Sequence, residues 1–467
     1  AEGQWTDGDF VRFRYGLPEK IGGWQQITTD TLAGIVRKQL VWADLDGRRY
    51  AALGTNKILI IYYEGSFYDI TPLDTAITGA TFTTANTSPI VVVNKTAHAL
   101  SQGDYFTFTS VTAPSGAGYS TADFTTNSFE VVSVPSQDTF TITMASNAGT
   151  TVAASGAATI NPYIRFGPLN QAAGFGWGTS GYGGASGIVT TLNGSLSDNT
   201  AGTGGSGTSI TVTSTTGFAT IGTVKVGAEF ISYTGITTTT LTGITRAVGG
   251  TRSAHSSGAS VEAVTGWGSA SLSSSVSLEP ASWSLDHFGE RLIATVKNGK
   301  VFEWNPIHAN IAALTTRATV VSGAPTSSVM SIVSERDRHL ILLGTETTVG
   351  DPATQDPMFI RFSDQENLSD YSPTSINTAG TFRLDSGTSI VGAAKAKDYI
   401  LVLTDTAAYV IQFVGPPFTF SIRQVGSNCG LIGQHAVKYS NGRVWWMGQA
   451  GGFFVYDGTV KSLPCLV

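Results

Sequence analysis

Short apolar runs bounded by Gly, Asp, Asn or Pro recur along the whole chain, and none of them has the spacing of an amphipathic helix. Residues 10–14 alternate apolar and basic side chains, and residues 209–213 alternate hydroxyl and apolar side chains. Residues 399–405 form an apolar run that ends at Asp405. Alternation with a period of two, and short apolar runs between turn residues, both indicate strands. We therefore expect an all-β protein.

One pattern of strands and turns repeats. Residues 398–413 and 443–456 share the same order: a charged residue, an apolar strand, a short polar turn and a second apolar strand. The distance between them along the chain matches the repeat length of propeller blades, which is roughly 40–50 residues. The pattern is also present in 1–72, and it returns near residue 281, where Asn298-Gly299 between apolar runs is a strong hairpin signal. We expect 1–72 and 265–467 to form one discontinuous β-propeller.

Two segments interrupt that pattern and are predicted to be inserted modules. Residues 73–162 are rich in Thr, poor in charge and contain strand-like runs, which predicts a small β-barrel or sandwich. Residues 206–264 predict a second, smaller β module near the size limit for an independent core. The Gly-rich connection 163–205 mixes glycine with aromatics at 172–184, as in a flexible surface loop or a loop packed on a neighbouring subunit.

Composition agrees with a β-rich chain and excludes some functions. Only 13% of the residues are charged and 55 are glycine, which is typical of sheets joined by many turns. The net charge of −6 argues against a protein that grips nucleic acid over a basic surface, but not against an acidic passage through which DNA slides. Cys429 and Cys465 show neither metal-ligand spacing nor a disulfide framework. We see no signal peptide or membrane span, and because residues 463–467 stop inside an apolar run we expect the natural chain to continue.

Two local motifs make positional predictions. Gly415-Pro416-Pro417 cannot donate ladder hydrogen bonds through its prolines, so it should connect two strands at an edge rather than lie in a central strand. The pair Trp445-Trp446 is predicted to pack between sheets rather than to form a ligand platform.

Candidate chemistry is sparse. The 6 histidines are scattered, and His98 and His255 lie near turns, where a structural role is expected. Asp364, Glu366 and Asp370 form the densest carboxylate cluster. Such a cluster can cap turns, bind calcium or supply the paired carboxylates of a glycosidase. The sequence has no Walker loop and no Gly-x-Ser-x-Gly elbow. We therefore expect no catalytic, cofactor or metal site, and no enzyme.

Several motifs together resemble one family of virion proteins. The chain resembles the tail nozzle proteins, also called tail tubular or hub proteins, of short-tailed bacteriophages. The motifs that carry the resemblance are residues 12–24, 283–286, 361–367, 414–418 and 456–465. The runs 96–104 and 229–234 also resemble small β domains that recur in phage virion proteins.

The resemblance implies a structural role in a phage tail. It implies a homohexameric ring below the portal and adaptor, with tail fibres as further partners and double-stranded DNA passing non-specifically through the lumen during genome ejection. The protein would be located in the virion and assembled in the cytoplasm of the bacterial host. Two alternatives stay open. One is a tail adhesin that binds host-surface glycans, and the other is a propeller glycoside hydrolase that uses Asp364 or Glu366.

Overall fold

The structure is a computed structural model, which describes residues 10–23, 26, 31–136, 138–166, 185–197, 209–249, 252–264, 282–306, 314 and 316–463. This part of the chain folds almost entirely into strands. Its helical elements are a short α-helix, α1 (Thr121–Thr125), and a 3₁₀ turn, η3 (Pro352–Thr354). The all-β prediction is confirmed. The Gly- and aromatic-rich segment 172–184 and Cys465 lie outside the described residues.

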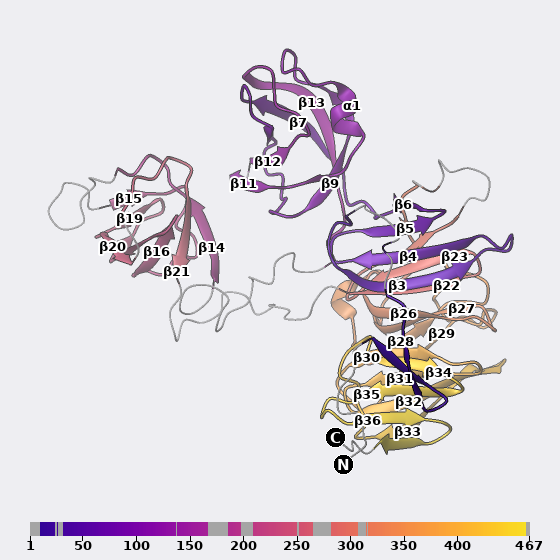
Figure 1. Cartoon of the computed structure of the whole chain (residues 1–467). Coiled ribbons are helices and arrows are strands. Elements are labelled where there is room, and N and C mark those ends of the chain that lie inside the picture. The colour runs from indigo at the N-terminus through magenta and orange to yellow at the C-terminus, as the bar shows by residue number, and fades with distance from the viewer. Residues whose placement is uncertain are drawn as a thin grey trace.

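Five antiparallel sheets of four strands each form what we call the body, and in each sheet the spatial order of the strands follows the chain. In Figure 1 these sheets lie together, the first in indigo and the others in pink to yellow. Their strands are β3 (Val36–Ala43), β4 (Arg49–Thr55), β5 (Leu59–Tyr63) and β6 (Ser66–Asp69); β22 (Trp283–Phe288), β23 (Arg291–Val296), β24 (Val301–Trp304) and β25 (Thr319–Val320); β26 (Ser328–Ser334), β27 (His339–Thr345), β28 (Phe359–Phe362) and β29 (Gly380–Arg383); β30 (Ile390–Lys395), β31 (Ile400–Thr404), β32 (Ala407–Gly415) and β33 (Thr419–Ser427); β34 (Val437–Ser440), β35 (Arg443–Met447), β36 (Phe453–Tyr456) and β37 (Val460–Leu463).

The sheets of the body pack on one another in chain order. Strand β3 contacts β22, β22 contacts β26, β26 contacts β30 and β30 contacts β34, so the first strand of each sheet lies beside the first strand of the next. An apolar cluster fills each of these four sheet-to-sheet interfaces. Strands β27 and β31 are buried along their whole length, because a sheet covers each of their faces.

The first inserted segment forms one curled sheet of seven strands. The spatial order is β10-β9-β13-β7-β8-β12-β11. Its core is aromatic, with Phe82, Phe106, Phe124 and Phe140 all fully buried. The strands are β7 (Ile77–Thr84), β8 (Ile90–Asn94), β9 (Tyr105–Thr112), β10 (Phe129–Glu130), β11 (Ser133–Ser136), β12 (Thr139–Thr143) and β13 (Val152–Pro162).

The second inserted segment has a five-stranded and a three-stranded sheet around one apolar cluster. It begins earlier than the sequence pattern indicated, because β14 pairs with β21 although it precedes the predicted boundary at 206. Glycines around this short strand hid its alternation. The strands are β14 (Ala185–Thr191), β15 (Ser209–Thr211), β16 (Gly222–Val226), β17 (Glu229–Tyr233), β18 (Gly235–Ile236), β19 (Thr240–Thr242), β20 (Thr245–Gly249) and β21 (Ser260–Val264).

The turns at Asn298 and at Pro416-Pro417 and the pair Trp445-Trp446 were predicted from local sequence. Asn298 has φ +55 in the connection that joins β23 to β24, so the predicted hairpin is present, although the connection is longer than a two-residue turn. Pro416 and Pro417, joined by a cis peptide bond, are exposed and lie between β32 and β33, so their predicted place outside a central strand is confirmed. Trp446 is buried as predicted and donates from Nε1 to the Cys429 carbonyl over 2.8 Å, whereas Trp445 remains 38% exposed.

A separate hairpin precedes the body. It consists of β1 (Val11–Arg14) and β2 (Leu17–Lys20), which pair with each other and are exposed at every residue.

Candidate functional site

The predicted carboxylate cluster holds turns together. Asp364 Oδ1 accepts from the backbone N–H of Thr378 over 2.8 Å and from its hydroxyl over 2.7 Å. Burial opposes ionisation of Asp364, but the hydrogen bonds outweigh it and hold the pKa of Asp364 below its ordinary value. Asp370 Oδ2 accepts from the Asn377 amide over 2.9 Å. Glu366, 64% exposed, lies 3.5 Å from the Arg338 guanidinium.

The two histidines singled out from the sequence each bind a loop to its own sheet. His98 is buried, accepts the backbone N–H of Leu100 at Nδ1 over 3.0 Å, and packs edge-on against Phe140. His255 Nε2 lies 2.9 Å from a carboxylate oxygen of Glu229. Both histidines are therefore engaged in local structure.

Glu229 is the centre of a buried ionic cluster that sequence reasoning missed. Arg246 meets it in a bidentate pair, with Nε at 2.6 Å and Nη2 at 2.7 Å, and both side chains are almost completely buried. The backbone N–H groups of Ala247 and Ser253 also donate to Glu229. Burial raises the pKa of Glu229, but the bonds from Arg246, His255 and Ser253 outweigh it and lower that pKa to about 2. The sequence did contain one clue to this cluster: Glu229 occupies a position on the buried face of an alternating strand, where an apolar residue is expected.

A polar junction fixes the first inserted sheet to the body. Arg317 Nη1 lies 2.8 Å from Asp69 Oδ1, and its Nη2 donates to the Tyr163 hydroxyl over 2.9 Å. The Tyr163 hydroxyl in turn donates to Asp69. Nearby, Lys57 of the body lies 2.8 Å from Glu130 of the inserted sheet. These contacts hold the two parts in one relative position.

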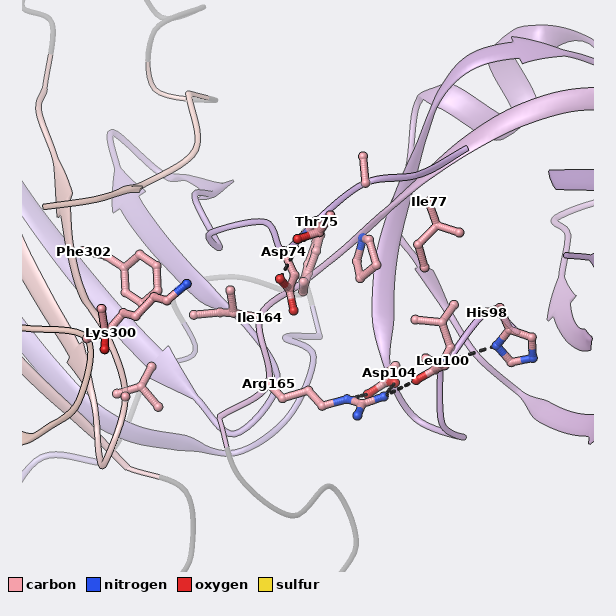
Figure 2. Close-up of a pocket in the computed structure, with 17 residues that line it drawn as sticks. Asp74, Thr75, Ile77, His98, Leu100, Asp104, Ile164, Arg165, Lys300 and Phe302 are labelled. Atoms are coloured by element: carbon pink, nitrogen blue, oxygen red, sulfur yellow. Dashed lines mark hydrogen bonds and ion pairs between the residues drawn. The ribbon is translucent and has the colours of Figure 1, made fainter. Parts of the chain in front are cut away.

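A pocket of about 630 Å³ lies beside that junction. Figure 2 shows Arg165 and Asp104 on the side of the inserted sheet, with Lys300 and Phe302 on the side of the body. Arg165 Nη2 donates to Asp104 Oδ2 over 2.6 Å and to the carbonyl of Ala99 over 2.9 Å. On one wall of this pocket, Arg165 and Asp104 are paired with each other. On the opposite wall, the ammonium group of Lys300 is exposed.

The first strands of all five body sheets line a second pocket, of about 360 Å³. On one side, the Lys395 ammonium lies 2.8 Å from Asp286 and 2.5 Å from Glu335. Burial lowers the pKa of Lys395, but the two carboxylates outweigh it and raise that pKa above its ordinary value.

Asp286, His287 and Glu335 could together approach a metal ion, since their ligand atoms lie within 4.8 Å of one another. Lys395 already supplies the positive charge between the two carboxylates, so these residues do not fit a resident cation.

No family model and no curated protein sequence matches this chain. Among solved structures, apo AztD from Citrobacter koseri is 8% identical over 84% of this chain and 72% of its own, with a TM-score of 0.28. The phage phi92 endosialidase is 13% identical over 92% of this chain and 55% of its own, with a TM-score of 0.22. The tricorn protease is 9% identical over 93% of this chain and 40% of its own, with a TM-score of 0.20. Similarity at this level assigns neither a fold family nor a function.

No helix in the described ranges is long and apolar enough to cross a membrane.

Proposed function

We propose that the body is a β-propeller and that the chain is a structural protein of a phage tail, forming a ring around the channel for genome ejection. Two features support the propeller: each body sheet follows chain order, as blades do, and the first strands of all five sheets line one pocket. The sequence motifs that resemble those of nozzle proteins support the tail assignment.

Three exposed apolar side chains on the body, which we call the Ile376–Phe418 patch, support the structural role. Ile376, Val414 and Phe418 are 95%, 53% and 75% exposed. They belong to two adjacent sheets, because Ile376 precedes β29 and the other two flank the turn between β32 and β33. The Thr419 hydroxyl donates to the Thr378 carbonyl over 3.1 Å and joins the two loops. Apolar side chains gathered on a rigid body are typical of a contact with another chain.

The charge of the chain suits a channel. Closed rings form when identical chains make the same contact repeatedly around an axis. With a net charge of −6, a lumen built from this chain would bind phosphates weakly, so double-stranded DNA would pass without sticking. The proposed partners are further copies in a homohexamer, an adaptor or portal ring, and tail fibres.

Image reconstruction of intact particles is the decisive experiment. We expect density for this chain in a ring around the tail axis, with the Ile376–Phe418 patch at the contact between copies. Density in peripheral fibres or spikes would overturn the nozzle proposal and favour the adhesin. Particles lacking the chain should retain packaged DNA poorly or fail to eject it, which nuclease protection measures.

The pocket in Figure 2 favours one second candidate, a glycan-binding tail protein. Its volume of about 630 Å³ lies within the range of small-ligand sites, which is ~300–1,000 Å³. Binding of the purified chain to a glycan array, reduced by Lys300→Ala, would support this candidate. An array without binders would leave the structural role as the better proposal.

A further inference from the structure

The central pocket of the body has a basic side that faces the Asp286–Lys395–Glu335 cluster. Lys38, which is half-buried, lines it from β3, and His435 and Lys438, which are both exposed, line it from β34 and the residues just before that strand. Within the described residues, none of these three side chains has a hydrogen bond or an ion pair. Basic side chains from two segments that are far apart in the sequence therefore line one pocket, and none of them forms an ion pair with a carboxylate among the described residues.

The electrostatics of this side are unfavourable in the free protein. Burial, and then the charge of Lys438, lowers the pKa of Lys38, against a weaker opposite effect of Asp286. Partial desolvation in the pocket, and then the charge of Lys38, lowers the pKa of His435 below its ordinary value, although the side chain is still exposed to solvent. The carboxylates across the pocket cannot relieve this repulsion well, since Lys395 already lies between them.

An unsatisfied donor lies in the same pocket. The Gln434 side chain is held by a hydrogen bond of 2.5 Å from the Ser282 hydroxyl to its Oε1. Its Nε2 is buried and has no hydrogen-bond partner. Buried polar atoms are satisfied in almost all native structures, so this N–H donor beside lysines without an ion pair is available to an acceptor bound in the pocket.

We propose that this pocket binds a small multivalent oxyanion of the phosphate class, held by Lys38, Lys438 and the Gln434 amide. Several oxygens on one centre satisfy all three donors at once, and charge-assisted hydrogen bonds are the strongest available. The volume of about 360 Å³ accommodates phosphate with waters or a phosphate monoester, whereas a duplex is far too wide to enter. The site belongs to a single chain, so it does not depend on the ring.

Proton uptake should accompany binding. An anion beside His435 favours its charged form and raises its pKa, so affinity should increase as pH falls. Sulfate is the suitable probe, because its charge stays constant over this range. The titratable and charged groups facing the pocket are Lys38, Asp286, His287, Glu335, Lys395, His435, Lys438 and Tyr439.

The test is calorimetric titration of the full chain with inorganic phosphate and with sulfate, at constant ionic strength set by sodium chloride. We expect saturable binding of one anion per chain. Lys38→Met and Lys438→Met should each weaken it about tenfold or more, the usual effect of losing a charged hydrogen bond. Lys38→Arg should retain most of it. Lys397→Met, which changes an exposed lysine outside this pocket, is the matched control and should bind as the parent chain does.

Folding of the variants is a second readout. Because Lys38 and Lys438 repel each other, each Met variant should melt at or above the temperature of the parent chain in anion-free buffer, and a given phosphate concentration should raise that temperature less than it does in the parent chain. Equal phosphate binding by the parent chain and both Met variants would overturn the proposal, as would no saturation at millimolar phosphate.

A short double-stranded oligonucleotide distinguishes the sources of the anion. Binding of phosphate and sulfate without binding of the oligonucleotide identifies a free small anion, whereas competition between phosphate and the oligonucleotide would overturn the assignment of a small anion to this narrow pocket. Oligonucleotide binding that survives Lys38→Met, with no binding of phosphate, would refute the pocket.

Discussion

At the scale of single residues, Glu229 and Arg246 show how a small module is made specific. Both charges are buried, and each lies in a strand of the same sheet. A buried pair contributes little net stability relative to apolar residues, but removing one partner leaves an uncompensated charge. The bonds from Ser253 and His255 recruit the loop before β21 to the same carboxylate, so one side chain fixes three segments.

Glu229→Gln should therefore destabilise the second inserted module strongly, by about 3–5 kcal/mol. Hydrogen exchange of the full chain measures this locally: protection should fall in β17 and β20 and stay unchanged in the body. Glu262→Gln is the matched control, since Glu262 lies on β21 of the same sheet and has no ion pair among the described residues. Equal protection in the two variants would contradict the prediction.

Acid should unfold this module late. The pKa of Glu229 lies near about 2 in the folded state, below its ordinary value of 4.5, so the ionised form favours folding. That contribution is complete above pH 4.5 and is lost as pH falls toward 2. Protection of β17 amides measured from pH 6 to pH 2 should decline mainly below pH 4.5. A decline centred above pH 5 would show that another group controls the module.

At the scale of elements, close packing between sheets depends on residues far apart in the chain. Gly54 of β4 lies directly under the indole of Trp283, which begins β22 and is fully buried. The Trp283 Nε1 donates to the Thr55 carbonyl over 2.9 Å. A Cβ on Gly54 would lie 2.5 Å from the ring, so the indole can cover the strand only because residue 54 has no side chain.

Gly54→Ala should destabilise the body by about 1–3 kcal/mol, the usual effect of overpacking. Thermal unfolding monitored by tryptophan fluorescence is the measurement. Gly452→Ala is the control, because a Cβ there would meet the ring of Phe454 at an ordinary 3.7 Å. A melting temperature for Gly54→Ala equal to that of the control would show that Trp283 can move aside.

Sequence patterns predicted the strands and turns, but not which strands and side chains contact one another. Strand type, the Asn298-Gly299 turn and the Pro416-Pro417 connection could be predicted because period, turn chemistry and missing N–H groups are local properties. The Trp42 indole bonds the carbonyl of Glu290, 248 residues away, and no local pattern encodes such a contact. Glu229 was missed for the same reason, since its partners are identified only once the strands pair.

At the scale of the whole molecule, the first inserted sheet behaves as a self-contained unit on a fixed base. Its aromatic core draws only on residues 77–160, from its strands, α1 and the loops between them. Its two ends lie side by side, because Leu73 pairs with Tyr163 and the N–H of Asp74 donates to the carbonyl of Pro162 over 2.8 Å. A short linker can therefore replace the module without stretching the chain.

Replacing residues 75–161 by a short Gly-Ser linker should leave the body folded, with its tryptophan-monitored melting temperature close to that of the parent chain. The body should still bind phosphate in its central pocket. Arg317→Met in the intact chain is the companion variant: it removes the contacts to Asp69 and Tyr163 and should loosen the module while both parts stay folded. Limited proteolysis at the junction would detect this. Loss of all soluble protein on deletion would show that the sheet belongs to the core of the body.

The proposed ring should depend on apolar contacts more than on charge. Ile376→Ser combined with Phe418→Ser removes the two most exposed side chains of the patch, and both lie outside the buried core. We expect the double variant to melt like the parent chain but to be lost from assembled particles, as measured by mass spectrometry of purified virions. Ile221→Ser, which changes a 66% exposed residue of the second inserted module, is the control and should assemble normally.

Since only 13% of the residues are charged, added salt should weaken the ring only modestly, because salt screens chiefly exposed charges. Normal incorporation of the double variant, or a ring that dissociates steeply with salt, would place the contact elsewhere on the molecule.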